Sequence, residues 1–129
     1  MKKNRKIILI GIFCLLLLVF IFVQILSHRI VKQANDIAIN DIDLSSVENG
    51  EYIGEYAITP VYAKVKISVK NQEIVDIQIL EHNNGLGTSA EKIVDKVLEN
   101  QSLDIDAVSG ATVSSRCILK AIDNAIEKE

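Results

Sequence analysis

Ten consecutive residues near the C-terminus, 106–115, hold the side chains of this sequence that are best suited to chemistry. They read Asp-Ala-Val-Ser-Gly-Ala-Thr-Val-Ser-Ser, so four hydroxyl groups and a glycine come directly before a stretch with helical periodicity. Small residues let a ligand approach the backbone, and the N–H groups and positive dipole at a helix N-terminus stabilise a bound phosphate. The residues alone leave two interpretations open: a phosphate-binding turn, or a plain helix cap made by Thr112 or Ser114.

A small sheet is expected to position this segment, because two stretches upstream alternate between apolar and polar residues. The alternation covers 61–69 and 75–79, and residues 70–73 (Lys-Asn-Gln-Glu) supply a tight connection, which predicts an antiparallel hairpin. A further strand is expected over 52–58. Residues 81–87 contain two asparagines and two glycines, and we predict a loop there.

Two helices are expected to cover one face of this sheet. Thr88 and Glu91 have capping-box spacing, and apolar residues then recur at helical intervals through about Glu99. A second helix is predicted after Thr112. Its apolar stripe consists of Ile118, Leu119, Ile122, Ala125 and Ile126. Because helices with one apolar face need a sheet to cover, the predicted fold class is α+β: a small antiparallel sheet packed with two or more helices, preceded by one transmembrane helix.

The transmembrane helix is expected over residues 7–26, a run of twenty in which only Gly11 and Gln24 are not apolar. This length crosses a hydrocarbon core of about 30 Å. A basic segment, 1–6, precedes the run, so the positive-inside rule predicts a single-pass anchor in a bacterial cytoplasmic membrane with the N-terminus inside. The alternative is a cleaved signal peptide, but the run exceeds the usual core of about 7–15 residues and no small-residue cleavage site follows.

Beyond the anchor, a tether over 27–47 and an extracytoplasmic domain over 48–129 are expected. From residue 33 onward, 17 acidic residues stand against eight basic ones, which gives a net charge of −9. Such a domain repels phosphate backbones, so nucleic acid is not an expected partner. The two cysteines, Cys14 and Cys117, fall in different compartments on this topology, so we expect no disulfide and no metal site from them.

Four segments of this sequence resemble the FMN-binding domain family, which includes subunits of sodium-pumping and Rnf-type membrane redox complexes. They are 49–54 (Asn-Gly-Glu-Tyr-Ile-Gly), 70–75 (Lys-Asn-Gln-Glu-Ile-Val), 80–83 (Leu-Glu-His-Asn) and 106–115, in the family's order. The likeness covers about residues 48–129. It therefore extends over nearly the whole domain expected on the outer face.

The resemblance implies a covalently bound flavin. In the family, a flavin transferase moves FMN from FAD onto a threonine hydroxyl and leaves a phosphoester, and the matching residue is Thr112. Hydroxyls of Ser114 and Ser115 lie close in sequence and are the alternatives. Asp106 matches the acidic residue that opens the modification motif, so it resembles a recognition element for the transferase. The residues that the resemblance places around the phosphate are Ser109, Gly110, Ala111 and Ser114.

A second group of candidate residues resembles the family's glycine-containing loop near the isoalloxazine ring. His82 is one candidate for contact with the flavin, and an exposed polar loop residue is the alternative. Leu86, Gly87 and Thr88 are candidates because backbone N–H groups at a helix start can bond the flavin's carbonyl oxygens. Tyr62 could stack on the ring, although packing is the plainer interpretation.

The function expected from these features is that of an electron carrier rather than a stand-alone enzyme. FMN would pass one or two electrons from a membrane donor to an extracytoplasmic acceptor, and no residue is expected to be catalytic. Two alternatives are kept. One is a small reductase with noncovalent FMN, and the other is a flavin-free envelope binding module in which Thr112 only caps its helix.

Overall fold

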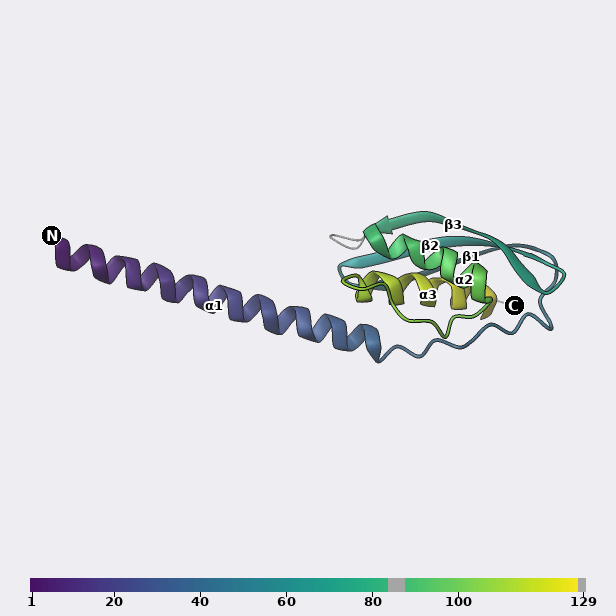
Figure 1. Ribbon diagram of the computed structural model, residues 1–129, viewed down its shortest axis with the longest axis horizontal. Coiled ribbons are helices and arrows are strands. Elements are labelled where there is room, and N and C mark those ends of the chain that lie inside the picture. The colour runs from purple at the N-terminus through teal and green to yellow at the C-terminus, as the bar shows by residue number, and fades with distance from the viewer. Residues whose placement is uncertain (84–87, 128–129) are drawn as a thin grey trace. The chain divides into compact units, whose positions relative to one another are not determined.

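The computed structural model describes residues 1–83 and 88–127, and the chain divides into two compact units, Met1–Ile30 and Val31–Glu129. The elements follow one another as helix α1 (Lys2–Asn35), strands β1 (Gly50–Ile58), β2 (Val61–Lys70) and β3 (Glu73–Asn83), 3₁₀ helix η1 (Thr88–Lys92), and helices α2 (Ile93–Asn100) and α3 (Thr112–Glu127) (Figure 1). The fold class is α+β, as predicted.

Helix α1 leaves its apolar side chains exposed along its length. Its most apolar window of 18 residues has a mean hydropathy of 3.2, and none of that window is buried against protein. Exposed leucines, isoleucines and phenylalanines in this number need a non-aqueous environment, because burying apolar surface is the main driving force of folding. Helix α1 is therefore long and apolar enough to cross a membrane.

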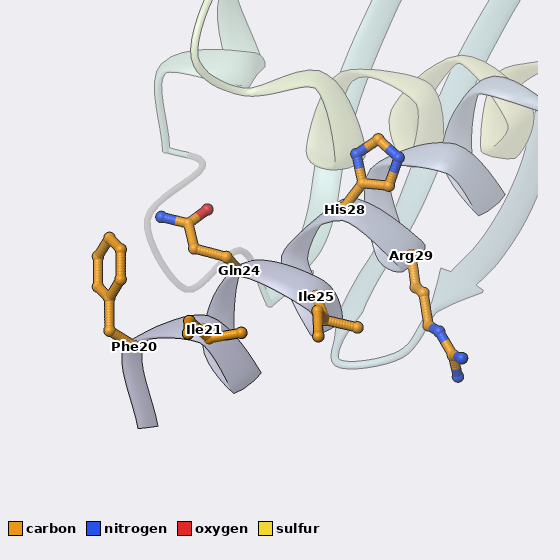
Figure 2. A pocket seen from close by; sticks show the side chains of 6 residues that line it. All are labelled: Phe20, Ile21, Gln24, Ile25, His28 and Arg29. Carbon is orange, nitrogen blue, oxygen red and sulfur yellow. The ribbon is translucent and has the colours of Figure 1, made fainter. Parts of the chain in front are cut away.

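A pocket of about 500 Å³ lies on α1, and all of its lining side chains come from that helix. Figure 2 shows them: Phe20, Ile21, Gln24, Ile25, His28 and Arg29. They project from consecutive turns at the end of the apolar run, where lipid would cover the helix in a membrane. The pocket is thus a feature of the helix surface and is not a candidate for the functional site.

The second unit is built on a three-stranded antiparallel sheet of order β1-β2-β3. The predicted hairpin is confirmed, since β2 ends at Lys70 and β3 begins at Glu73. Asn71 and Gln72 between them have φ angles of 52° and 64°. Two consecutive residues with positive φ form the type of two-residue turn whose twist matches that of a hairpin, and asparagine tolerates this conformation well.

The core lies between one face of this sheet and helix α3. Val61, Ala63, Val65, Ile67 and Val69 on β2 are buried, and the residues that alternate with them are half-buried on the open face. Helix α3 packs closely on Gly54 of β1, where an added Cβ would lie 1.9 Å from the carbonyl oxygen of Ala121. Only glycine fits there, so this position sets how closely the helix approaches the sheet.

Helix α3 buries most of the apolar stripe predicted for it. Ile118, Leu119 and Ile122 are fully buried, Ala125 is 1% exposed, and Ile126 is only half-buried. Helix α2 is confirmed as well, and it ends at Asn100. A 3₁₀ turn, η1, precedes it, so the segment predicted as one helix begins as a 3₁₀ turn at Thr88, and α2 itself is preceded by Lys92 without a side-chain hydrogen bond that caps it.

Strand β3 continues through residues that were predicted to be loop. Glu81, His82 and Asn83 pair with Lys64, Ala63 and Tyr62 of β2. The physical reason is a shift of register between Lys64 and Val65, which leaves one unpaired residue on β3. A bulge of this kind breaks the two-residue alternation without ending the ladder, so the sequence pattern stops before the strand does.

Most of the segment expected to be a tether belongs to the second unit. Ala34, Leu44 and Val47 have exposed fractions of 0%, 5% and 9%. Residues 36–49 contain no helix or strand, and they lie along α3 on their way to β1 (Figure 1). Their side chains and backbone are therefore part of the folded unit over much of this length.

Candidate functional site

The turn over residues 108–111 brings the chemistry-bearing segment to the start of α3. The N–H of Ala111 donates to the carbonyl oxygen of Val108 at 2.9 Å, which closes a β-turn. Gly110, the third residue of that turn, has φ 76°, as in type II turns, and nothing lies within 4 Å of a Cβ added to it. The turn thus needs glycine for its backbone and leaves open space beside it.

The hydroxyls that follow this turn differ in their surroundings. Ser115 is fully buried, and its Oγ accepts a hydrogen bond from the N–H of Val108 at 3.0 Å. Ser114 is 2% exposed, whereas Thr112 is half-buried. Within residues 1–83 and 88–127, the Thr112 hydroxyl makes no hydrogen bond. Thr112 thus presents the accessible hydroxyl of the three.

Neither Thr112 nor Ser114 caps α3, so that simple interpretation is wrong. The first helical hydrogen bond runs from the N–H of Ser115 to the carbonyl oxygen of Ala111 at 2.9 Å, which makes Ala111 the capping residue. Ala111 has no side-chain acceptor, and it is 5% exposed. Ser115 stabilises the turn instead, by holding the backbone of Val108. The sequence showed Ser115 only as one of several hydroxyls.

A second set of polar groups lies at the end of β3. Figure 1 shows β3 ending and α3 beginning at the same end of the sheet, which we call the Thr112 end. There the His82 side chain is 2% exposed, with its Nδ1 atom 3.2 Å from Oε1 of Glu91. Its Nε2 atom is buried and has no hydrogen-bond partner among the described residues. The alternative of an exposed loop histidine is therefore wrong.

Tyr62 lies on the open face of the sheet rather than in the core. Its hydroxyl donates to Oε2 of Glu55 at 2.7 Å. That carboxylate raises the pKa of Tyr62 to about 12, because the hydrogen bond favours the protonated phenol. The side chain is half-buried, and its polar tip is already engaged on the sheet surface.

Cys117 lies one turn inside α3 and is fully buried. Its Sγ atom donates to the carbonyl oxygen of Tyr56 at 3.1 Å, and burial raises the thiol's pKa to about 11. A buried thiol of this kind is protonated and unreactive at neutral pH. Cys117 is thus a small core residue of the domain. Within the part of the chain that the structure describes, no cluster of His, Cys, Asp or Glu could hold a metal ion.

Residues 59–127 match the model of a family described as the FMN-binding domain. This chain belongs to that family. FMN is accordingly its cofactor, and the matched residues include β2, β3, the turn over 108–111 and all of α3.

One curated relative is an NADH:acrylate oxidoreductase from Vibrio harveyi. It is 28% identical over 107 residues, which is 81% of this chain and 10% of that protein. The chain thus spans about a tenth of the length of the relative it matches.

The start of α3 fits the phosphate of FMN through its backbone donors. The N–H groups of Thr112, Val113 and Ser114 make no hydrogen bond within residues 1–83 and 88–127, as expected for the first turn of a helix. A phosphate there would accept these donors and meet the positive end of the helix dipole. The open space beside Gly110 leaves room for such a group at the surface.

The remaining candidate residues lie around this turn or outside the described chain. Asp106, Ser109 and Gly110 are exposed. Thr88 is the first residue of η1. Leu86 and Gly87 lie outside the described residues.

Arg116 is a residue of this region that sequence reasoning missed. It follows Thr112 by one turn of α3, and its guanidinium donates to two carbonyl oxygens, from Nε to Ala34 at 3.1 Å and from Nη2 to Ile37 at 2.6 Å. Its partners lie about 80 residues earlier in the chain. No local signal in the sequence could have paired them.

Proposed function

We propose that this protein carries FMN as a phosphoester on Oγ1 of Thr112 and acts as an electron carrier. The observation that supports this most directly is the contrast between three neighbouring hydroxyls. Ser114 and Ser115 are buried, and Thr112 is half-buried at the exposed turn where the helix donors begin. A transferase can reach only a hydroxyl that is accessible, so Thr112 is the residue we assign.

Attachment requires a flavin transferase as partner and FAD as the flavin donor. The Thr112 oxygen forms a bond to the phosphorus of the FMN half, and the pyrophosphate bond of FAD breaks. AMP leaves, and the hydroxyl proton passes to a base supplied by the transferase. No electrons are gained or lost in this step. Asp106, exposed six residues before Thr112, is the recognition element that we assign to the transferase.

Once the flavin is attached, the chain's own groups have three tasks. The N–H groups of Thr112, Val113 and Ser114 bind the phosphate oxygens, and Ser109 offers a further hydroxyl donor from the exposed turn. Gly110 keeps side-chain bulk away from the phosphate. His82 presents its buried Nε2 atom at the same end of the sheet, as a donor or acceptor for the flavin ring.

Electron transfer is the role that this set of residues favours. FMN supplies reversible uptake of one or two electrons, and the protein's part is to hold it and to set its surroundings. The relative in Vibrio harveyi is an oxidoreductase, but this chain spans about a tenth of it. We therefore infer for this chain the redox role alone and not the relative's substrates.

The domain is proposed to work on the outer face of the cytoplasmic membrane. Four basic residues, Lys2, Lys3, Arg5 and Lys6, precede the apolar run, and basic residues flanking a span stay on the cytoplasmic side. A covalent link is useful outside the cell, because flavin lost there could not be replaced from the cytoplasmic pool. On this topology the basic N-terminal residues stay in the cytoplasm, and the domain that carries the flavin lies outside.

The proposal is tested by producing the full chain in a bacterial host with and without a flavin transferase and viewing denaturing gels under ultraviolet light. We expect a fluorescent band only with the transferase. Thr112→Ala should remove the band, and Ser114→Ala, the matched control two residues further along the helix, should keep it.

Two other results would contradict the proposal in different ways. Flavin that copurifies with the native chain but leaves it on acid precipitation would indicate noncovalent FMN, as in a small reductase. A chain without any flavin, in cells that modify a control substrate, would indicate a flavin-free binding module.

A further inference from the structure

The chain that follows the apolar run is fastened to helix α3 by several hydrogen bonds. We call residues 34–41 the strap. Ala34 is fully buried, and Arg116 donates to its carbonyl oxygen and to that of Ile37. Further along, the N–H of Asn40 donates to Oδ2 of Asp123 at 3.1 Å. These contacts join backbone to side chain across about 80 residues of sequence, so they hold the strap in one place on the domain.

The strap runs along α3 in the same direction as the helix. Its first residue is bound by Arg116, one turn after Thr112, and the side chain of Asn40 donates to Glu127 in the last turn. Figure 1 shows this segment lying beside α3. Asp41 then closes the strap, because its Oδ1 atom accepts from the N–H of Leu103 and from the hydroxyl of Ser102, each at 2.9 Å.

This direction decides which end of the domain the chain from the membrane reaches first. Leu26 ends the apolar run, and Ala34 follows eight residues later. Eight residues span at most about 28 Å even when fully extended, whereas a free tether over 27–47 could span about 70 Å. If the strap ran along α3 in the opposite direction, the Thr112 end would lie further from the membrane by on the order of 24 Å, the length of α3.

We propose that the strap is a positioning element that keeps the Thr112 end of the domain close to the membrane. This inference rests on the proposed function, since the flavin is assigned to that end. Its consequence is that the flavin is held within reach of a redox group in the same membrane. Arg116 is the positioning residue, because it ties the first residue of the strap to the helix that begins at Thr112.

The test measures the distance of two labelled sites from the bilayer surface and needs no flavin. The full chain carries Cys14→Leu, so that the buried Cys117 is its one remaining native thiol. A fluorophore is attached to Ser109→Cys at the Thr112 end, or to Glu73→Cys at the start of β3. Each chain is reconstituted into phosphatidylcholine vesicles that contain lipids with nitroxide-labelled headgroups, and quenching of the fluorophore is recorded.

We expect the label at residue 109 to be quenched several-fold more than the label at residue 73. An insertion of eight Gly and Ser residues between Ser27 and His28 lies outside the domain, so it cannot unfold it, and it should remove most of this difference. Arg116→Gln should reduce the difference in part. Lys96→Gln, which changes an exposed lysine on α2, is the matched control and should leave the quenching unchanged.

Equal quenching of the two labels in the original chain would overturn the proposal. The same holds if the insertion left their difference intact, because the length between Leu26 and the strap would then not set the position. Both results are independent of flavin attachment. They would leave the assignment of Thr112 untouched, just as a failure of that assignment would leave the strap untouched.

Discussion

The two ends of the sheet differ in how their polar groups are hydrogen-bonded. At the hairpin end, Gln101 donates to and accepts from the backbone of Ile74 at 2.8 and 2.9 Å, and the N–H of Asn71 donates to Oδ1 of Asn49 at 2.8 Å. At the Thr112 end, the first N–H groups of α3 and Nε2 of His82 have no partner within residues 1–83 and 88–127. A buried polar atom is normally paired, so the unpaired Nε2 atom of His82 points to a ligand at this end.

Thr112→Ala is expected to have the largest effect, and this effect should be on flavin attachment and not on the stability of the fold. Loss of the hydroxyl should abolish covalent flavin completely. Because Thr112 is half-buried and its hydroxyl makes no hydrogen bond within the described residues, the free energy of unfolding should change by less than about 0.5 kcal/mol. Urea unfolding of the full chain in detergent, read beside the flavin content, checks both expectations. A destabilised variant would mean that the hydroxyl is structural.

Gln101→Ala is the converse change at the hairpin end. It leaves the partly buried N–H and carbonyl of Ile74 without their partners, and this should lower the free energy of unfolding by about 1–3 kcal/mol. Flavin attachment to the folded chain should stay complete. If attachment fell while the chain remained folded, the two ends would not be independent, and the contrast between them would be lost.

His82→Leu tests whether the buried imidazole contacts a ligand and is not needed for the stability of the flavin-free fold. A buried polar atom without a partner costs free energy, so the flavin-free chain should become more stable by about 1 kcal/mol when leucine replaces it. In the flavin-bearing chain, the same change should shift the visible absorption of the flavin. Destabilisation like that of Gln101→Ala would contradict this, because it would indicate that Nε2 is already bonded.

The smallest expected effect concerns acid stability at Asp41. Hydrogen bonds from the N–H of Leu103, then of Ile42, and from the Ser102 hydroxyl lower the pKa of this carboxyl below its ordinary 3.8. A lowered folded-state pKa contributes stability above the unfolded-state pKa, and that contribution is lost as pH falls through the folded value. Between pH 5 and 2, roughly, Asp41→Asn should therefore lose less stability than the original chain. Parallel melting curves against pH would contradict it.

The sequence predicted those parts of the fold that depend on local periodicity. The two-residue alternation of β2 and β3 and the apolar stripe of α3 identify the hairpin and the helix, because side chains on one face repeat at 2.0 and 3.6 residues. The end of β3 was missed, because the bulge near Leu80 breaks the alternation while the ladder continues to Asn83.

Contacts between distant segments could not be predicted from the same patterns. Arg116 binds carbonyl groups of Ala34 and Ile37, and the strap followed no periodicity that would show it as part of the domain. Within the site, the turn and helix start were expected from glycine and helical spacing. Which hydroxyl is accessible depends on how α3 packs on the sheet, and this separates Thr112 from Ser115 only in the folded chain.

The most direct test of the central claim is the intact mass of the full chain produced with a flavin transferase, followed by peptide mapping. We expect one added FMN phosphoester, located on the peptide that carries Thr112 and absent from Thr112→Ala. An unmodified mass, in cells whose transferase modifies a control substrate, would contradict it. So would an FMN group mapped to Ser114, Ser115 or any other residue.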